Sequence, residues 1–265
     1  MRRQFIFLVV LALLASWLLT GCGSAKGTLQ FTANGEDFVR QGFVSKDGWA
    51  ITFDHVYITL AGVTAYQSDP PYDPHAGGEV QSKAKVSLDG AYTVDLAEGG
   101  EDAPPILVGE VQDAAEGHYN AISWNVAQAS GGPTVGYSLV IDGVAEKDGQ
   151  TVDFTIRLEP EYTYVCGEYV GDERKGLLQE GGTADLEMTF HFDHIFGDAE
   201  TPMDDELNVS ATGFEPFAGA AEGGALDIDI AGLQAMLPAG DYQTLVDVLP
   251  TLGHVGEGHC HSETH

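Results

Sequence analysis

Histidines are concentrated in two short stretches of this chain. Four of the nine lie in the last twelve residues and two more lie near position 190; the six are His191, His194, His254, His259, His261 and His265. Neutral imidazole is the commonest protein ligand for zinc, copper and nickel. The tail is also rich in glycine, which lets the backbone turn so that several rings can reach one ion. This crowding predicts a transition-metal site.

The expected ligands come from both histidine stretches and from one apolar strand: His191, His194, His254, His259, His261 and His55. On an extended chain His259 and His261 point to the same side, and His194 can turn back towards His191 at the end of a strand. Such a set suits Zn²⁺ or Cu²⁺. Because bound imidazole must be neutral, we expect the affinity to fall as the pH drops through about 6.5.

Each group of histidines also has a simpler interpretation. The tail would then be a loose, polar chain end with adventitious affinity for metal, since chain ends are usually poorly ordered. His191 and His194 would be ordinary strand-end residues, hydrogen-bonded to carbonyls. His55 would be a satisfied histidine in the core or at a sheet edge. The sequence leaves these alternatives open.

Two cysteines decide whether the tail is held in place. Cys22 has a separate role at the amino end, which leaves Cys166 and Cys260. Two thiols in an oxidising compartment most often pair, and this disulfide would contribute roughly 4–5 kcal/mol in the chain-entropy model. It would fix the tail beside Cys166 and remove Cys260 as a thiolate ligand. The competing interpretation keeps both cysteines as metal ligands or redox thiols.

The amino-terminal segment predicts export and lipidation. Arg2 and Arg3 precede an apolar stretch over 5–19, and Leu19-Thr20-Gly21-Cys22 resembles the lipobox of bacterial lipoproteins. Residues 1–21 would be the signal peptide, Cys22 would be acylated with palmitate-type chains that anchor it to the membrane, and 22–27 would be a tether. The resemblance implies the bacterial cell envelope, on the periplasmic face or the cell surface. Gly23 favours the outer membrane, and an uncleaved anchor remains the alternative.

The chain is strongly acidic. Its net charge of −30 becomes −32 once Arg2 and Arg3 leave with the signal peptide. Such a surface repels phosphate backbones, which excludes nucleic acid as a partner. It also concentrates cations, in agreement with metal handling, although solubility outside the cytoplasm explains the charge equally well.

Hydrophobic periodicity predicts an all-β fold. Short alternating or β-branched runs are separated by turn residues; the expected strands are 28–32, 50–60, 86–94, 119–127, 136–144, 151–162 and 183–192. In the last of these His191 and Asp193 would face water. Asp142-Gly143 and Asp148-Gly149 have the composition of hairpin turns. A main domain over 28–215 would be followed by a C-terminal extension, 216–265, with short helices at Ile230–Leu237 and Tyr242–Leu249, the second capped by Asp241.

Part of the chain resembles known families. The quoted motifs are Asp47-Gly48-Trp49, Phe53-Asp54-His55-Val56-Tyr57-Ile58, Val94-Asp95-Leu96, Ile106-Leu107-Val108-Gly109 and Gly117-His118-Tyr119. Their order within 48–127 is similar to that of DUF4382-type domains of bacterial lipoproteins and to the layout of periplasmic MbnP-like copper-associated proteins. The resemblance implies an immunoglobulin- or transthyretin-like antiparallel β-sandwich. It does not extend to the histidine tail.

The sequence therefore predicts a lipid-anchored, extracytoplasmic protein that binds Zn²⁺ or Cu²⁺ in metal capture or homeostasis, with the membrane and a metal importer or outer-membrane receptor as partners. No nucleophile elbow, zinc-protease, Walker or dinucleotide motif is present, so we expect no enzymatic activity. The alternative is an adhesion or ligand-binding β-sandwich in which the histidines are incidental.

Overall fold

The computed structural model describes residues 25–167, 169 and 175–265, and β-strands dominate them. Fourteen strands of this part belong to one sheet, in the order β14-β10-β9-β3-β8-β11-β16-β15-β13-β1-β6, with β2, β4 and β5 also pairing with β3. Strands β7 and β12 form a separate pair. The strands are β1 (Lys26–Asn34), β2 (Phe43–Val44), β3 (Ala50–Ser68), β4 (Ser82–Ser87), β5 (Ala91–Asp95), β6 (Ile106–Ala115), β7 (Gly117–His118), β8 (Ala121–Val126), β9 (Leu139–Lys147), β10 (Gln150–Leu158), β11 (Tyr162–Cys166), β12 (Leu177–Leu178), β13 (Thr183–Phe190), β14 (Ala225–Asp229), β15 (Gly253–Val255) and β16 (Gly258–Thr264).

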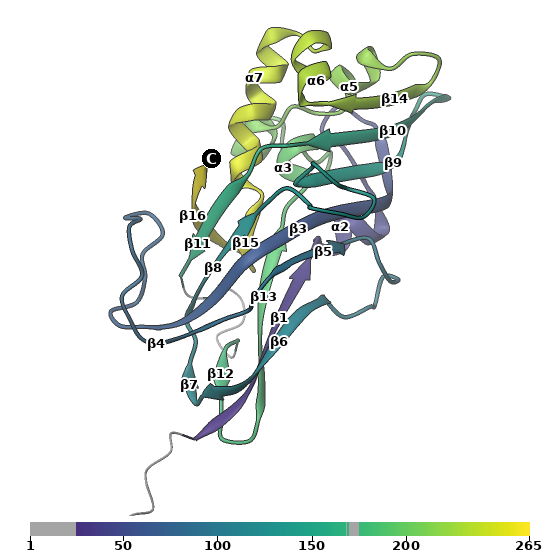
Figure 1. Ribbon diagram of the computed structural model, residues 1–265. Helices are drawn as coiled ribbons and strands as arrows, with labels where there is room; N and C mark the ends of the chain where they lie inside the picture. The colour runs from purple at the N-terminus through teal and green to yellow at the C-terminus, as the bar shows by residue number, and fades with distance from the viewer. Residues whose placement is uncertain (1–24, 168, 170–174) are drawn as a thin grey trace, which may run out of the picture.

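The large sheet curls into a half-barrel (Figure 1). The expectation of a mainly β-protein is confirmed, but the two-layer sandwich is wrong. Strand β3 is 19 residues long and changes partners along its length, from β9 at its start to β8, β4 and β5 further on. Register shifts interrupt its ladders at Phe53/His55 and at Ala61/Thr64. Such irregularities bend a strand and increase its twist, so one continuous sheet can wrap around the core that two flat layers would otherwise enclose.

Aromatic side chains fill the inside of the curve. Phe53 contacts Phe154, Phe192 and Phe196, with ring centroids 6.3–6.4 Å apart, and Phe196 packs on Phe214 at 5.9 Å. These rings join the main sheet to the short helices that follow β13, so the strand end near residue 190 is firmly packed.

Only one of the two predicted turn dipeptides forms a hairpin turn. Asp148 and Gly149 connect β9 to β10 with φ values of 53° and 83°, as a tight hairpin turn requires. Asp142 and Gly143 instead lie inside β9. A Cβ at Gly143 would come within 2.2 Å of the Thr52 carbonyl oxygen, so this glycine allows β9 and β3 to approach closely at the irregularity in β3.

Six α-helices and one 3₁₀ helix occur in the described residues: α2 (Glu36–Gln41), α3 (Asp193–Phe196), α4 (Glu206–Ser210), α5 (Glu215–Ala220), α6 (Ile230–Met236), α7 (Ala239–Val248) and η1 (Leu249–Thr251). Helices α6 and α7 correspond to the two predicted ones. Asp241 is not a cap, because α7 begins earlier, after Pro238. Asp229 caps α6, accepting a hydrogen bond from the Gly232 backbone N–H. Helices α5, α6 and α7 gather at one end of the sheet, and β1 begins at the other (Figure 1).

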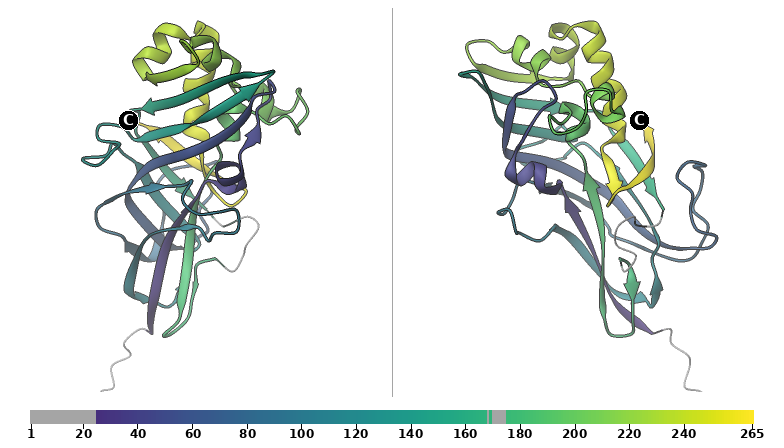
Figure 2. Two further views of the ribbon diagram at one scale, coloured as in Figure 1. Left: turned by 90° about the vertical axis from the view of Figure 1, so that its right-hand side faces the viewer. Right: turned by 180° about the vertical axis from the view of Figure 1, so that it is seen from behind.

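The C-terminal extension contributes strands to the same sheet. Strand β14 pairs in parallel with β10, and the hairpin β15–β16 lies between β13 and β11. Figure 2 shows this hairpin beside β13, with α7 leading into it. The histidine tail is therefore held within the body of the molecule.

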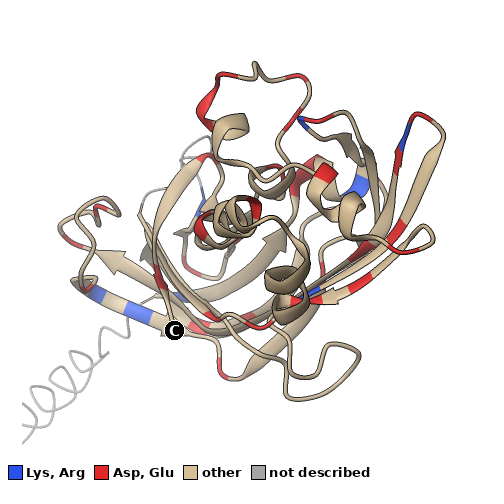
Figure 3. Cartoon of the chain, turned by 90° about the horizontal axis from the view of Figure 1, so that it is seen from above, with Lys and Arg blue, Asp and Glu red and all other residues tan. Residues whose placement is uncertain are grey.

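The described part of the chain begins close to the predicted lipidation site. The predicted signal peptide 1–21 and the predicted lipidation site Cys22 lie outside the described residues, and β1 already begins at Lys26, inside the predicted tether. No helix in the described part is long and apolar enough to cross a membrane. Asp and Glu residues are spread over strands, helices and loops, with few Lys or Arg among them (Figure 3).

Candidate metal centre

Three histidine rings meet where β13 ends. The ring centroids of His191 and His254 are 4.1 Å apart, those of His194 and His254 5.1 Å, and those of His191 and His194 5.4 Å. His259 extends the group, with its ring centroid 4.8 Å from that of His254. Four of the six predicted ligands are therefore brought together. We call these four side chains the histidine cluster.

Local structure explains how the rings converge. His191 directly follows β13, where its backbone N–H donates to the Leu252 carbonyl, 3.0 Å away. The chain then turns into α3, so His194 comes back towards His191, as its spacing predicts. His254 on β15 lies opposite Thr189 of β13, and His259 lies opposite His254 across the terminal hairpin.

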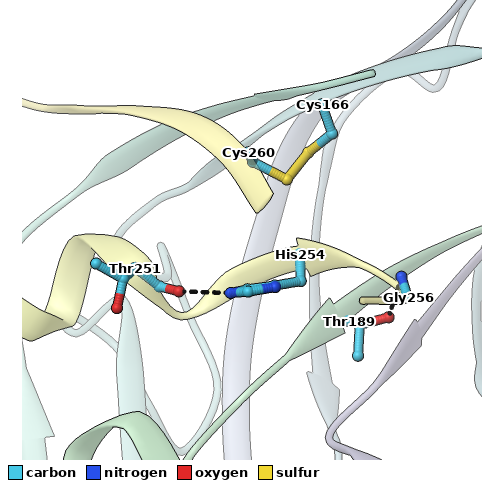
Figure 4. The surroundings of a disulfide bond; sticks show 6 residues. All are labelled: Cys166, Thr189, Thr251, His254, Gly256 and Cys260. Carbon is cyan, nitrogen blue, oxygen red and sulfur yellow. Dashed lines mark hydrogen bonds between the residues drawn. A yellow bond between two sulfur atoms is a disulfide. The ribbon is translucent and has the colours of Figure 1, made fainter. Parts of the chain in front are cut away.

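A disulfide and a hydrogen bond hold the hairpin in place. Cys260 of β16 is bonded to Cys166 of β11, so the residue after His259 is tied to a neighbouring strand. On the other side, the Gly256 N–H donates to the Thr189 hydroxyl at 3.3 Å. Both contacts flank His254 in Figure 4. Cys260 is thereby unable to serve as a thiolate ligand.

The burial of this region differs from the sequence prediction. His191 is only 8 % exposed and Asp193 7 %, although simple alternation along the strand predicts that both face water. The strand ends at Phe190 and α3 begins at Asp193, so the alternation of the strand does not extend to these two residues. His191, His254 and Asp193 therefore lie in a poorly solvated environment, where electrostatic interactions are strong, whereas His259 is exposed.

The other two predicted ligands lie apart from these ring contacts. His261 packs against Gly77 of the loop between β3 and β4, and its Nε2 is 3.6 Å from a carboxylate oxygen of Glu263. The Nδ1 of His55 is 2.7 Å from Asp95 Oδ2, and its ring stacks on Tyr57. Residues His259 and His261 share one side of an extended strand as expected, yet only His259 reaches the cluster.

Thr251, which sequence reasoning missed, orients two of the rings. Its hydroxyl donates to the Val248 carbonyl at 2.8 Å, so the same oxygen must accept from the Nδ1–H of His194, 2.9 Å away. Its carbonyl accepts from the Nε2–H of His254 at 3.0 Å. Each ring is thus protonated on the nitrogen that faces Thr251 (Figure 4 shows the His254 contact). The lone pairs of His194 Nε2 and His254 Nδ1 are left for a metal.

We predict that Thr251→Val weakens Zn²⁺ binding by about 10-fold or more, as removal of ligand-orienting hydrogen bonds commonly does. Valine keeps the shape of threonine but no longer accepts from His194. Thr251→Ser, which keeps the hydroxyl, is the matched control and should bind like the wild type. Competition titration with a zinc-chelating dye measures both. Equal affinities for the valine and serine variants would contradict the role given to the hydroxyl.

His191, His194 and His254 are neutral near neutral pH. Burial, followed by the neighbouring His191, lowers the pKa of His194 to about 4 and that of His254 to about 3. Burial also lowers the pKa of His191. A lowered pKa means that protons compete with a metal only at correspondingly lower pH. For these rings, loss of affinity should begin below the pH of about 6.5 that applies to an unperturbed histidine.

Carboxylates surround the rings. Oε1 of Glu36 lies 3.4 Å from His191 Nε2, and Oδ1 of Asp193 lies 4.0 Å from His191 Nδ1. Burial, then repulsion by Asp193 and Glu257, raises the pKa of Glu36 to about 7, and burial raises the pKa of Asp193. Removing solvent from several carboxylates in one place is costly unless a cation compensates.

Glu36 carries no sequence signal that links it to the histidines. The parallel register of β1 and β13 pairs Asn34 with Thr189, so the residues two positions further on, Glu36 and His191, come out side by side. Only the tertiary pairing of these distant strands reveals the contact.

Several polar atoms of the centre have no partner within the described part of the chain. His191 Nε2, His254 Nδ1 and Asp193 Oδ1 are buried there without a hydrogen bond. Buried polar atoms are nearly always paired, and an ion bound at the site is one recognised reason for an exception. Ligand atoms of His191, Asp193 and His194 lie within 4.8 Å of one another, so this group could hold a metal ion.

A groove leads to the centre from outside. It has a volume of about 450 Å³ and lies between α4 and α7; its lining includes His194, Thr251, Glu206 and Asp247. The two carboxylates make the entrance attractive to cations, and His194 is the cluster member that the groove reaches.

Comparison with protein-family models, with curated proteins and with solved structures finds no match to this chain. The resemblance of residues 48–127 to lipoprotein sandwich families therefore stays a prediction. Any assignment of function has to rest on the centre itself.

Proposed function

We propose that this protein binds a transition-metal ion through the histidine cluster and acts in metal capture or homeostasis at the bacterial cell envelope, anchored by a lipid on Cys22. The observation that carries the proposal is the convergence of His191, His194 and His254 with two lone pairs left free by Thr251. Preformed neutral imidazoles of this kind match the requirements of a metal ligand.

The ligand types favour Zn²⁺ or Cu²⁺. Imidazole nitrogen suits both ions, and the nearby carboxylates of Glu36 and Asp193 suit their double charge. The disulfide withdraws both Cys166 and Cys260 from coordination, which disfavours a soft thiolate site. The chemistry therefore points to a divalent ion held by nitrogen and oxygen.

Capture and delivery fit the centre better than catalysis. His191 and His254 are buried, and the groove beside His194 provides a path for an ion to enter and leave. The acidic surface would concentrate cations around this entrance. A metal importer or an outer-membrane receptor would be the partner that receives or supplies the ion.

Titration of the full chain, purified in detergent and stripped of metal, tests the proposal. We expect one Zn²⁺ or Cu²⁺ per chain with a dissociation constant below about 1 μM, corresponding to more than about 8 kcal/mol of binding free energy. Isothermal calorimetry gives stoichiometry and affinity together. Absence of binding at micromolar concentration would overturn the assignment.

If the protein binds no metal, the groove between α4 and α7 favours the alternative function, a ligand-binding module. At about 450 Å³ it is within the range of small-ligand sites, and Leu207, Val209 and Val248 give it apolar walls. A ligand-binding module would then use this groove, and the histidines would be incidental to its role.

A further inference from the structure

Glu36 has an unusual backbone conformation for its residue type. It directly follows Gly35 at the end of β1 and begins α2 with φ at +58°, in the left-handed region that glycine, asparagine and aspartate mostly occupy. The Asn34 side chain accepts a hydrogen bond from the Glu36 N–H at 3.0 Å, which stabilises this turn. Non-glycine residues persist in such conformations when the surroundings require it, and they gather at functional sites.

The turn directs the carboxylate to a specific atom. Glu36 Oε1 lies 3.4 Å from His191 Nε2, but the two do not form an aligned hydrogen bond, and His191 Nε2 is among the buried atoms without a partner in the described chain. In a tetrahedral zinc site with bonds of 2.0–2.1 Å, neighbouring ligand atoms are about 3.3 Å apart. The pair already has the separation that a shared ion would impose.

The other ring nitrogen of His191 has a different neighbour. Its Nδ1 is 4.0 Å from Asp193 Oδ1. If Nε2 binds the ion, Nδ1 carries the proton and faces the Asp193 carboxylate, which is the usual arrangement around a metal-bound histidine. The two carboxylates thus have distinct roles, one on the ion and one behind the ring.

We infer that Glu36 is a direct ligand of the metal ion, adjacent to His191 Nε2, and that its charge selects divalent over monovalent cations. This inference rests on the proposed function, because it describes the same centre. A carboxylate adds a full negative charge to an otherwise neutral set of imidazoles. That charge favours Zn²⁺ or Cu²⁺ over a singly charged ion such as Ag⁺, which serves as the probe for Cu⁺ chemistry.

The test compares Zn²⁺ and Ag⁺ binding by the full chain in three variants. Glu36→Gln keeps the shape and the amide oxygen but removes the charge, and we expect it to weaken Zn²⁺ binding at least about 10-fold while changing Ag⁺ binding by less than about 3-fold. His191→Ala should weaken both ions. Glu180→Gln, exposed in the turn that precedes β13 and so at the opposite end of that strand from His191, is the matched control and should change neither.

The outcomes separate the two proposals. If the wild type binds neither ion, the metal function itself fails. If it binds Zn²⁺ and Glu36→Gln binds equally well, the centre stands and Glu36 is not a ligand. Asp193→Asn tests whether the ion instead lies at Nδ1 of His191. If this variant loses more Zn²⁺ affinity than Glu36→Gln does, the ion is bound at Nδ1 beside Asp193, and the inference is overturned. Thermal unfolding of metal-free protein shows that each variant is folded.

Discussion

Replacing His254 with alanine should lower the affinity for Zn²⁺ by at least about 100-fold, more than the 10- to 100-fold that loss of a supporting residue costs. His254 is the central ring, in contact with His191, His194 and His259. Its removal leaves the remaining rings without their shared neighbour. Competition titration of the full chain measures the change.

His261→Ala is the matched control for this experiment. It removes an imidazole from the same terminal hairpin, but from a ring that packs against Gly77 and lies outside the cluster contacts. Its Zn²⁺ affinity should remain within about 3-fold of the wild type. If His261→Ala lost as much affinity as His254→Ala, the ion would be bound by the tail in some other arrangement, and the centre described above would be wrong.

Removing the Cys166–Cys260 disulfide should have the largest effect on stability. The bond joins residues 94 positions apart, and closing a loop of that length contributes about 4–5 kcal/mol in the chain-entropy model. We expect the double variant Cys166→Ala/Cys260→Ala to lose about this much free energy of unfolding in urea. Its Zn²⁺ affinity should fall as well, because β16 carries His259 and pairs with the strand that carries His254.

Added metal provides an internal check on that prediction. An ion that binds only the folded state restores stability in proportion to the logarithm of its concentration. Saturating Zn²⁺ should therefore recover part of the loss in the double variant. A free energy of unfolding within about 1 kcal/mol of the wild type, with no metal dependence, would mean that the hairpin is held by its strand pairing alone.

Much of the strand content could be read from periodicity. The run from Thr183 to Phe190 alternates, and Leu186, Met188 and Phe190 are buried as predicted. What periodicity cannot supply is the pairing between strands. The parallel ladder of β1 with β13 joins segments more than a hundred residues apart, and β15 is three residues long, too short to show any alternation. The curl into a half-barrel depends on these pairings and on the irregularities of β3.

The candidate site, like the fold, could be predicted from the sequence only in part. Crowding in the sequence pointed to His191, His194, His254 and His259, because residue type and spacing are visible there. It gave equal standing to His261, whose ring direction depends on how β16 twists against β15. Glu36 and Thr251 were missed, since each reaches the rings through tertiary contacts. The residue types that could bind a metal can thus be predicted from the sequence, whereas the residues that orient them through tertiary contacts cannot.

The proposed site combines Glu36 with His254, two residues that are far apart in the sequence. Glu36 follows β1, and His254 lies on β15. A chain that is only partly synthesised therefore lacks one of the two residues. Under the proposed function, an ion held by both residues is bound only after the chain has folded. In that case, the metal supply of the compartment in which folding finishes would decide which ion the protein acquires.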